Sequence, residues 1–235
     1  NPGDEIIVTN HTYQACRNSL DYIAKKSSAI VVVCEIPFPV KNSQIIFDKI
    51  VSCVNNNTKL AMIDTVTSPT GLKLPFEKIV KKLEDMDVKV LLDAAHGIGM
   101  FPMDLEEIGA SFTISNCHKW LCSPKGVAII HVRKDLQELI HPLTISHGMT
   151  FPLGETTRFR HEFDWTGTRD VSGWCVLPFL INTIFFCFVI ILLKYNTPIL
   201  LDIPNIKISI IVKKYLSDII LLSNVSFPSF TLSIL

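Results

Sequence analysis

Short runs of aliphatic and β-branched residues alternate with helical patterns from residue 5 to residue 132, and this alternation constrains the fold more than any other feature. The apolar runs are nearly continuous, which is typical of strands buried on both faces of a parallel sheet. Parallel strands require crossover connections, and the crossover helices cover the two faces. The sequence therefore predicts an α/β fold with a mostly parallel sheet flanked by helices. The six predicted strands are residues 5–9, 29–36, 60–66, 88–95, 111–115 and 126–132.

Two segments between these strands, residues 43–54 and 75–86, have apolar residues at helical spacing. Pro75 suits the first turn of the second helix, where its missing N–H leaves no hydrogen bond unmade. The apolar face of that helix is predicted to consist of Phe76, Ile79, Val80 and Leu83. In sheets of this kind ligands bind beyond the carboxyl ends of the strands, so functional residues are expected there.

The composition restricts the partners and the cellular compartment. The chain has 22 basic and 22 acidic residues, so its balanced charge gives no reason to expect a nucleic-acid partner. Its seven cysteines are an odd number and include no C-x-x-C pair, which favours reduced thiols over a disulfide framework or a metal site. We therefore expect a cytoplasmic protein without a bound metal.

Both ends of the chain are unusual. The first residues, NPGDEIIVTNH, read as a turn that leads directly into a strand, which indicates a start inside a domain. Residues 175–194 form a long apolar run that is a transmembrane-helix candidate by its length. The remaining residues, 195–235, contain no Gly and no Ala. Two interpretations of residues 175–235 compete: a membrane anchor, and a tail that is not native to the domain. We favour the second.

Two residues at neighbouring strand ends stand out chemically. Asp93 ends an apolar strand, where a carboxylate is costly unless a cation or strong donors meet it. Lys119 follows the next strand in apolar surroundings, and partial burial favours the uncharged amine, which is a good nucleophile toward carbonyl carbons. Taken singly, Asp93 could be a turn or N-cap residue, and Lys119 a loop lysine with an exposed head group.

Together the two residues meet the needs of pyridoxal 5′-phosphate. This cofactor requires a lysine for its aldehyde and a carboxylate for its protonated pyridine nitrogen. The nearby Gly97 and Gly99 form a G-x-G pattern, but it lacks the third glycine of a dinucleotide site.

Residues 91–132, LLDAAHGIGMFPMDLEEIGASFTISNCHKWLCSPKGVAIIHV, resemble the core signature of the class V aminotransferase family. The form N-x-HKW with SPKG is similar to the isopenicillin N epimerase-like and cysteine desulfurase-like branch. The resemblance covers residues 1–174 and implies a pyridoxal-phosphate-binding large domain of fold type I. The family's phosphate-binding loop and its C-terminal small domain have no counterpart here, so we expect an incomplete domain.

The resemblance implies a role for each matching residue. Lys119 would form the Schiff base and carry the proton of the substrate α-carbon. Asp93 would pair with the pyridine nitrogen, and His96 would bind the cofactor's 3′-oxygen. His11 would stack on the pyridine ring and assist proton transfer; alternatively it is a strand-end histidine bonded to the backbone.

Further roles follow from the same resemblance. Asn116 and His118 would reach the cofactor phosphate, although His118 could instead pack beside Trp120. Ser68, in a sequence that also suits an ordinary turn, would lie near the 3′-oxygen. Thr168 would reach the phosphate in the neighbouring subunit of a homodimer. His147 and Arg169 are candidates for binding a substrate carboxylate.

The resemblance thus implies a pyridoxal-phosphate-dependent enzyme that acts on a small amino acid. Elimination, epimerisation and transamination all begin with removal of the α-proton, so the signature does not separate them. By analogy with the branch, we favour a cysteine-type substrate and a lyase or desulfurase outcome. The alternatives are a catalytically incompetent fragment of such an enzyme, and a membrane-anchored binding module attached through residues 175–194.

Overall fold

The computed structural model describes residues 1–194, with side chains described up to Thr183. The chain divides into two compact units, residues 1–184 and 185–235. The expectation of a non-native tail for residues 195–235 lies outside the described residues, and the predicted domain boundary at residue 174 stays a prediction. No helix in the described part of the chain is both long enough and apolar enough to cross a bilayer.

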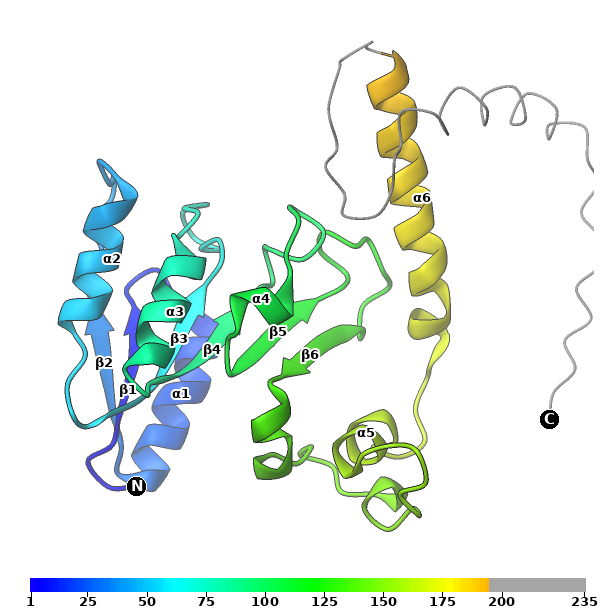
Figure 1. The fold of residues 1–235 in the computed structure, drawn as a ribbon, viewed down its shortest axis with the longest axis horizontal. Helices are drawn as coiled ribbons and strands as arrows, with labels where there is room; N and C mark the ends of the chain where they lie inside the picture. Colours follow the sequence, from blue (N-terminus) through cyan, green and yellow to red (C-terminus); the bar gives the residue numbers. More distant parts are fainter. Residues whose placement is uncertain (195–235) are drawn as a thin grey trace, which may run out of the picture. The chain divides into compact units, whose positions relative to one another are not determined.

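A single six-stranded sheet organises the first unit (Figure 1). Its spatial order is β2-β1-β3-β4-β5-β6, and the first five strands are parallel. The prediction of a mostly parallel α/β sheet is therefore confirmed, and each of the six predicted strands is present. The strands are β1 (Glu5–Thr9), β2 (Ile30–Cys34), β3 (Thr58–Asp64), β4 (Lys89–Asp93), β5 (Phe112–Asn116) and β6 (Ala128–Val132).

The sixth strand runs antiparallel to β5, with Asn116 opposite Ala128 and Phe112 opposite Val132. The reason is the length of the connection, because residues 117–127 contain no helix and are too few for a parallel crossover. As a result, β6 begins at the same edge of the sheet at which the five parallel strands end.

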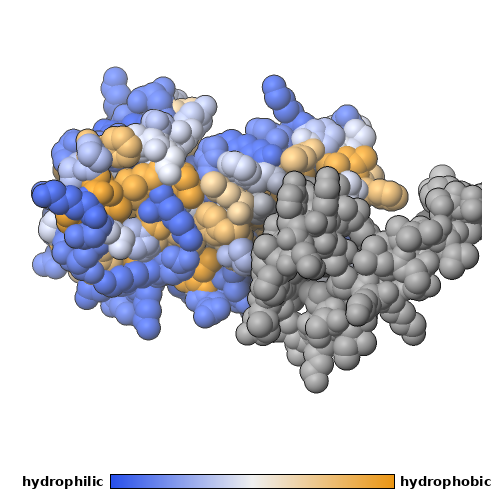
Figure 2. Space-filling model, turned by 90° about the horizontal axis from the view of Figure 1, so that it is seen from above, coloured by the Kyte–Doolittle hydropathy of each residue, from blue (hydrophilic) through white to orange (hydrophobic). Residues whose placement is uncertain are grey.

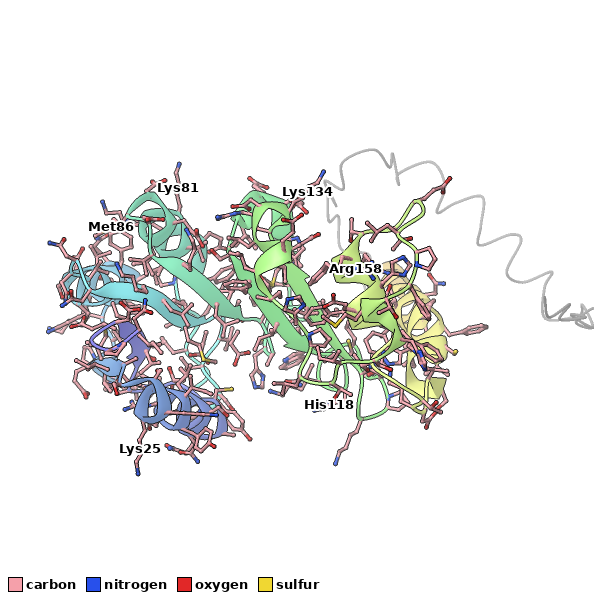
Figure 3. The ribbon with its side chains drawn as sticks, turned by 90° about the horizontal axis from the view of Figure 1, so that it is seen from below. Lys25, Lys81, Met86, His118, Lys134 and Arg158 are labelled. Carbon is pink, nitrogen blue, oxygen red and sulfur yellow. The ribbon has the colours of Figure 1, made fainter. Side chains whose placement is uncertain are left out.

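The helices lie on both faces of the sheet, with α2 and α3 on one side and α1 on the other (Figures 1 and 3). The two predicted helices are present, and each begins or ends within two residues of its predicted limits. The helix α1 was not predicted because it buries only Ala24 and so has no clear apolar stripe. The helices are α1 (Gln14–Ser27), α2 (Ser43–Ser52), α3 (Phe76–Asp85), α4 (Leu105–Ile108), α5 (Arg158–Asp164) and α6 (Ser172–Lys194).

The main core lies between the sheet and the pair α2 and α3. The predicted apolar face of α3 is fully buried there, together with Ile46 and Ile50 of α2. Successive side chains of a strand point to opposite faces, so Ile7 joins this core while Val8 is buried toward the other side. Other hydrophobic side chains reach the surface, where they form patches among hydrophilic residues (Figure 2).

One carboxylate, that of Glu84 near the end of α3, ties three strands together at the amino edge of the sheet. Its Oε1 accepts from the backbone N–H of Val90 in β4 at 3.0 Å. The same oxygen accepts from the N–H and hydroxyl of Ser111, just before β5, at 2.8 and 2.6 Å. Its Oε2 lies 2.8 Å from Nη1 of Arg133, just after β6. Glu84 therefore connects α3 to β4 and to the residues next to β5 and β6.

We expect Glu84→Ala to lower the free energy of unfolding by about 2–4 kcal/mol, because several partly buried donors lose their acceptor at once. Urea denaturation of the full chain measures this change. Glu77→Ala, on an exposed position of the same helix, is the matched control and should cost less than about 1 kcal/mol. Equal losses in the two variants would contradict this account of Glu84.

Candidate active site

The carboxyl ends of β3, β4 and β5, the start of β6 and the start of α1 enclose a cavity of about 420 Å³. Five of the residues predicted from the sequence line it together, although they are spread over fifty positions of the chain. These are Ser68, Asp93, His96, Asn116 and Lys119. The remaining lining residues are Tyr13, Cys16, Asp64, Ala95, Ile114, Ser115, Ala128, Ile129 and Ile130.

Asp93 is the last residue of β4 and is held by its neighbours. Its backbone carbonyl accepts from the N–H and the hydroxyl of Thr65, at 2.9 and 3.1 Å. Its Oδ1 accepts from the N–H of Ala95 at 2.9 Å. Its Oδ2 has only a weak contact, 3.9 Å from the thiol sulfur of Cys16. The side chain is 6% exposed, so the carboxylate is fixed at one oxygen and open to a cation at the other.

Lys119 lies in the tight turn that follows β5, where the N–H of Cys122 donates to its carbonyl. Its Nζ is 3.2 Å from Nε2 of His96 and 5.8 Å from the ring centre of Tyr13. The amine is thus half-buried against an imidazole and an aromatic face, inside the same cavity as Asp93.

The tautomer of His96 follows from its second contact. The indole Nε1–H of Trp120 donates to Nδ1 of His96 at 3.2 Å. Burial of the ring, followed by the charge that Lys119 carries when protonated, lowers the pKa of His96 from its usual 6.5, so the ring is neutral at pH 7. A neutral ring that accepts at Nδ1 has its hydrogen on Nε2, which is directed at Lys119.

Among the lining residues that sequence reasoning missed, three have titratable side chains: Tyr13, Cys16 and Asp64. Asp64 ends β3 as Asp93 ends β4, so the rule that singled out one acid would have found the other. Tyr13 and Cys16 belong to the turn and first residues of α1, a helix that the sequence pattern did not indicate.

The structure does not bring His11 into the cavity lining. Its Nε2 is 3.0 Å from the carbonyl oxygen of Ile36, and its Nδ1 is 3.1 Å from the hydroxyl of Thr70. Both ring nitrogens therefore have partners, as in the alternative interpretation of a strand-end histidine. His118 is half-buried in the loop after β5 and is likewise absent from the cavity lining (Figure 3).

The other candidates lie away from this cavity. Thr168 is exposed in the segment between α5 and α6, where a neighbouring subunit could reach it. Arg169 lies 5.6 Å from the ring of Trp174 and lines a different cavity beside β6. His147 is exposed and stacks on Phe151.

The two glycines after His96 have structural tasks. A Cβ at Gly97 would come within 2.8 Å of the sulfur of Met103 and 2.9 Å of the Thr65 hydroxyl. Gly99 has φ +86°, a conformation that other residues rarely adopt. Close packing and a left-handed turn thus account for the G-x-G pattern without a dinucleotide.

Comparison with known proteins accords with this geometry. Residues 1–184 match the family described as Aminotransferase class-V. The chain belongs to the class-V aminotransferase family. The family resemblance predicted from residues 91–132 is therefore confirmed.

The similar proteins include L-cysteine desulfhydrases and isopenicillin N epimerases. The chain is 34% identical to putative L-cysteine desulfhydrase 1 of Oryza sativa subsp. japonica, over 75% of this chain and 37% of that protein. It is 26% identical to isopenicillin N epimerase of Amycolatopsis lactamdurans, over 77% and 48%. The chain thus spans less than half the length of either relative.

A solved structure supports the fold. The apo structure of cysteine desulfurase from Thermococcus onnurineus NA1 matches with a TM-score of 0.67, at 20% identity, over 79% of this chain and 46% of that one. This class-V aminotransferase chain therefore has the fold of a cysteine desulfurase, fold type I.

We expect ¹⁵N NMR of the full chain to place the ring hydrogen of His96 on Nε2 at pH 7, with the midpoint of ring protonation below 6.5 because burial lowers its pKa. Trp120→Phe removes the indole donor, so the preference for this tautomer should be lost. Trp165→Phe, at an exposed tryptophan far along the chain, is the control. An unchanged tautomer in Trp120→Phe would overturn the assignment.

Proposed function

We propose that this chain supplies the cofactor-binding and proton-transfer centre of a pyridoxal-phosphate-dependent enzyme acting on an amino acid. The single observation that supports it most is the meeting of Lys119, His96 and Asp93 in one cavity from two neighbouring strand ends. Family membership supports the same class of chemistry. We assign the cofactor-binding part to residues 1–174.

The donor set fits pyridoxal 5′-phosphate. Asp93 has one carboxylate oxygen fixed by a backbone N–H and the other open, as a partner for a cationic ring nitrogen requires. Lys119 provides the amine, and Ser68, Asn116 and His96 provide donors for the cofactor's oxygens. When bound, the cofactor supplies an aldehyde that condenses with amines and a ring that withdraws electrons from the substrate α-carbon.

The chain's own residues would then act as follows. The Asp93 carboxylate holds a positive charge at the ring nitrogen and so favours electron withdrawal. The Nζ of Lys119 accepts the proton from the substrate α-carbon and returns it. The Nε2–H of His96 donates toward this region and keeps the amine oriented. The ring of Tyr13, which lines the cavity near Lys119, provides an aromatic face for a planar ligand.

We further propose a cysteine-type substrate and a β-elimination outcome. The names of the relatives support this choice, since four are L-cysteine desulfhydrases by name or by putative name. Epimerisation is the second candidate, on the strength of the isopenicillin N epimerase relatives. Both begin with the same proton transfer at Lys119.

The assembly and location are part of the same proposal. Thr168 lies exposed outside the cavity, which suits a role at the phosphate of a neighbouring subunit in a homodimer. We keep the roles that the family resemblance implies for the other candidates: the cofactor phosphate for His118, and a substrate carboxylate for His147 and Arg169. His11 would have to change its side-chain conformation to stack on a ligand. We propose the cytoplasm as the compartment.

Incubation with pyridoxal 5′-phosphate followed by borohydride should attach the cofactor covalently to Lys119, because borohydride reduces the carbon–nitrogen double bond between aldehyde and amine. Peptide mass spectrometry locates the label. Lys119→Ala should lose it, whereas Lys125→Ala, on an exposed lysine six residues away, should keep it. A full chain that takes no label at Lys119 would overturn the proposal and favour an incompetent fragment.

A further inference from the structure

A second carboxyl group lies beside Asp93 and has no role in the chemistry described above. Asp64 ends β3 and is the register partner of Asp93 on β4. It is 2% exposed and lines the same cavity. Its Oδ2 is buried and has no hydrogen-bond partner among the described residues.

Two buried, neighbouring carboxyl groups are unfavourable when both are ionised. Neighbouring carboxylates in a region of low dielectric repel each other, and an ionised oxygen without a donor loses its solvation. Burial, followed by the negative charge of Asp93, raises the pKa of Asp64 to about 7. A proton on one of the two carboxyl groups removes the repulsion, and Asp64 has the oxygen that is free to hold it.

We propose that Asp64 holds a proton next to Asp93, and that the presence or loss of this proton sets how strongly Asp93 holds a cationic ring nitrogen. This rests on the proposed function, and it adds a positioning residue to the site. With Asp64 protonated, the pair carries one negative charge. When Asp64 loses its proton to solvent, a second negative charge strengthens the hold of Asp93 on the cation.

The groups around Asp64 differ in whether they favour or oppose its ionisation. The thiol of Cys16 on α1 is a weak acid whose own pKa is raised, by burial and then by Asp93 and Asp64. The hydroxyl of Thr12 and the charge of Lys119 both favour the ionised form of Asp64. His96, neutral at pH 7, and Tyr13 are the other titratable groups of the cavity. Asp93 is thus the one group on these elements whose negative charge opposes ionisation of Asp64.

The sign of the pH dependence follows. The pKa of Asp64 is above its ordinary value of 3.8 in the folded chain, so the folded state retains a proton between pH 3.8 and about 7 that the unfolded state has lost. The associated stability is present at low pH and is lost as the pH rises through about 7. A cation bound beside Asp93 favours the ionised pair and shifts this transition toward acid.

Infrared difference spectroscopy of the full chain without cofactor tests the pair directly. The C=O stretch of a buried protonated carboxyl should disappear with a midpoint at about pH 7, and it should be absent from Asp64→Asn. In Asp93→Asn the midpoint should fall by about one pH unit or more, because the repelling charge is gone. Asp93→Ser serves if Asp93→Asn does not fold. Asp85→Asn, at an exposed acid of α3, should leave the midpoint unchanged.

Electrostatic coupling between two groups is reciprocal. The change in the Asp64 midpoint on removal of the Asp93 charge therefore also measures how strongly the charge of Asp64 acts on Asp93. A missing band, or a midpoint that is unchanged in Asp93→Asn, would overturn the proposal.

Adding pyridoxal 5′-phosphate separates this inference from the proposed function. If the cofactor labels Lys119 and the midpoint moves toward acid, the inference is supported. If Lys119 is labelled while the midpoint stays, the role of Asp64 fails and the proposed function stands. If the two carboxyls are coupled but Lys119 takes no label, the proposed function fails, and with it the assignment of the pair to a ring nitrogen.

Discussion

The burial of ionisable groups at one edge of an otherwise apolar sheet is the constraint on which the site depends. Strands such as β3 and β4 can be covered on both faces because the residues just before their final aspartates, 60–63 and 90–92, are hydrophobic. The acidic residues of these strands stand at their carboxyl ends, at Asp64 and Asp93. A carboxylate in that position needs a cation, a donor or a proton. The cavity beside these two residues is therefore a place where a cationic ligand can meet that need.

At the amino edge of the sheet, a carboxylate is instead satisfied by donors from the chain itself. Glu84 is nearly buried, yet it has a full set of donors from Val90, Ser111 and Arg133. It is a structural carboxylate that connects α3 to three strands. Asp64 has an unpartnered oxygen and faces a cavity. The contrast explains why satisfied buried acids contribute to the fold, whereas unsatisfied ones mark positions where a ligand or a proton completes the structure.

The fold could be predicted largely because its signal is local. Continuous apolar runs indicate buried parallel strands, and the face of α3 is readable from four residues. The helix α1 was missed because it buries only Ala24 and so has no clear apolar stripe. Asp93 and Lys119 were identifiable because one ends an apolar strand and the other lies in the turn just after the next strand. Tyr13 and Cys16 were not, since their place in the cavity depends on how α1 starts.

The sequence by itself determined the family, the parallel sheet and the strand ends at which the reactive residues lie, because these follow from residue types in consecutive order. Only the tertiary structure decided which of those residues meet. It placed Asp64 in register with Asp93, directed Trp120 to His96, and turned His11 toward the carbonyl of Ile36. These contacts depend on strand register and side-chain direction across segments far apart in the chain, which no local pattern records.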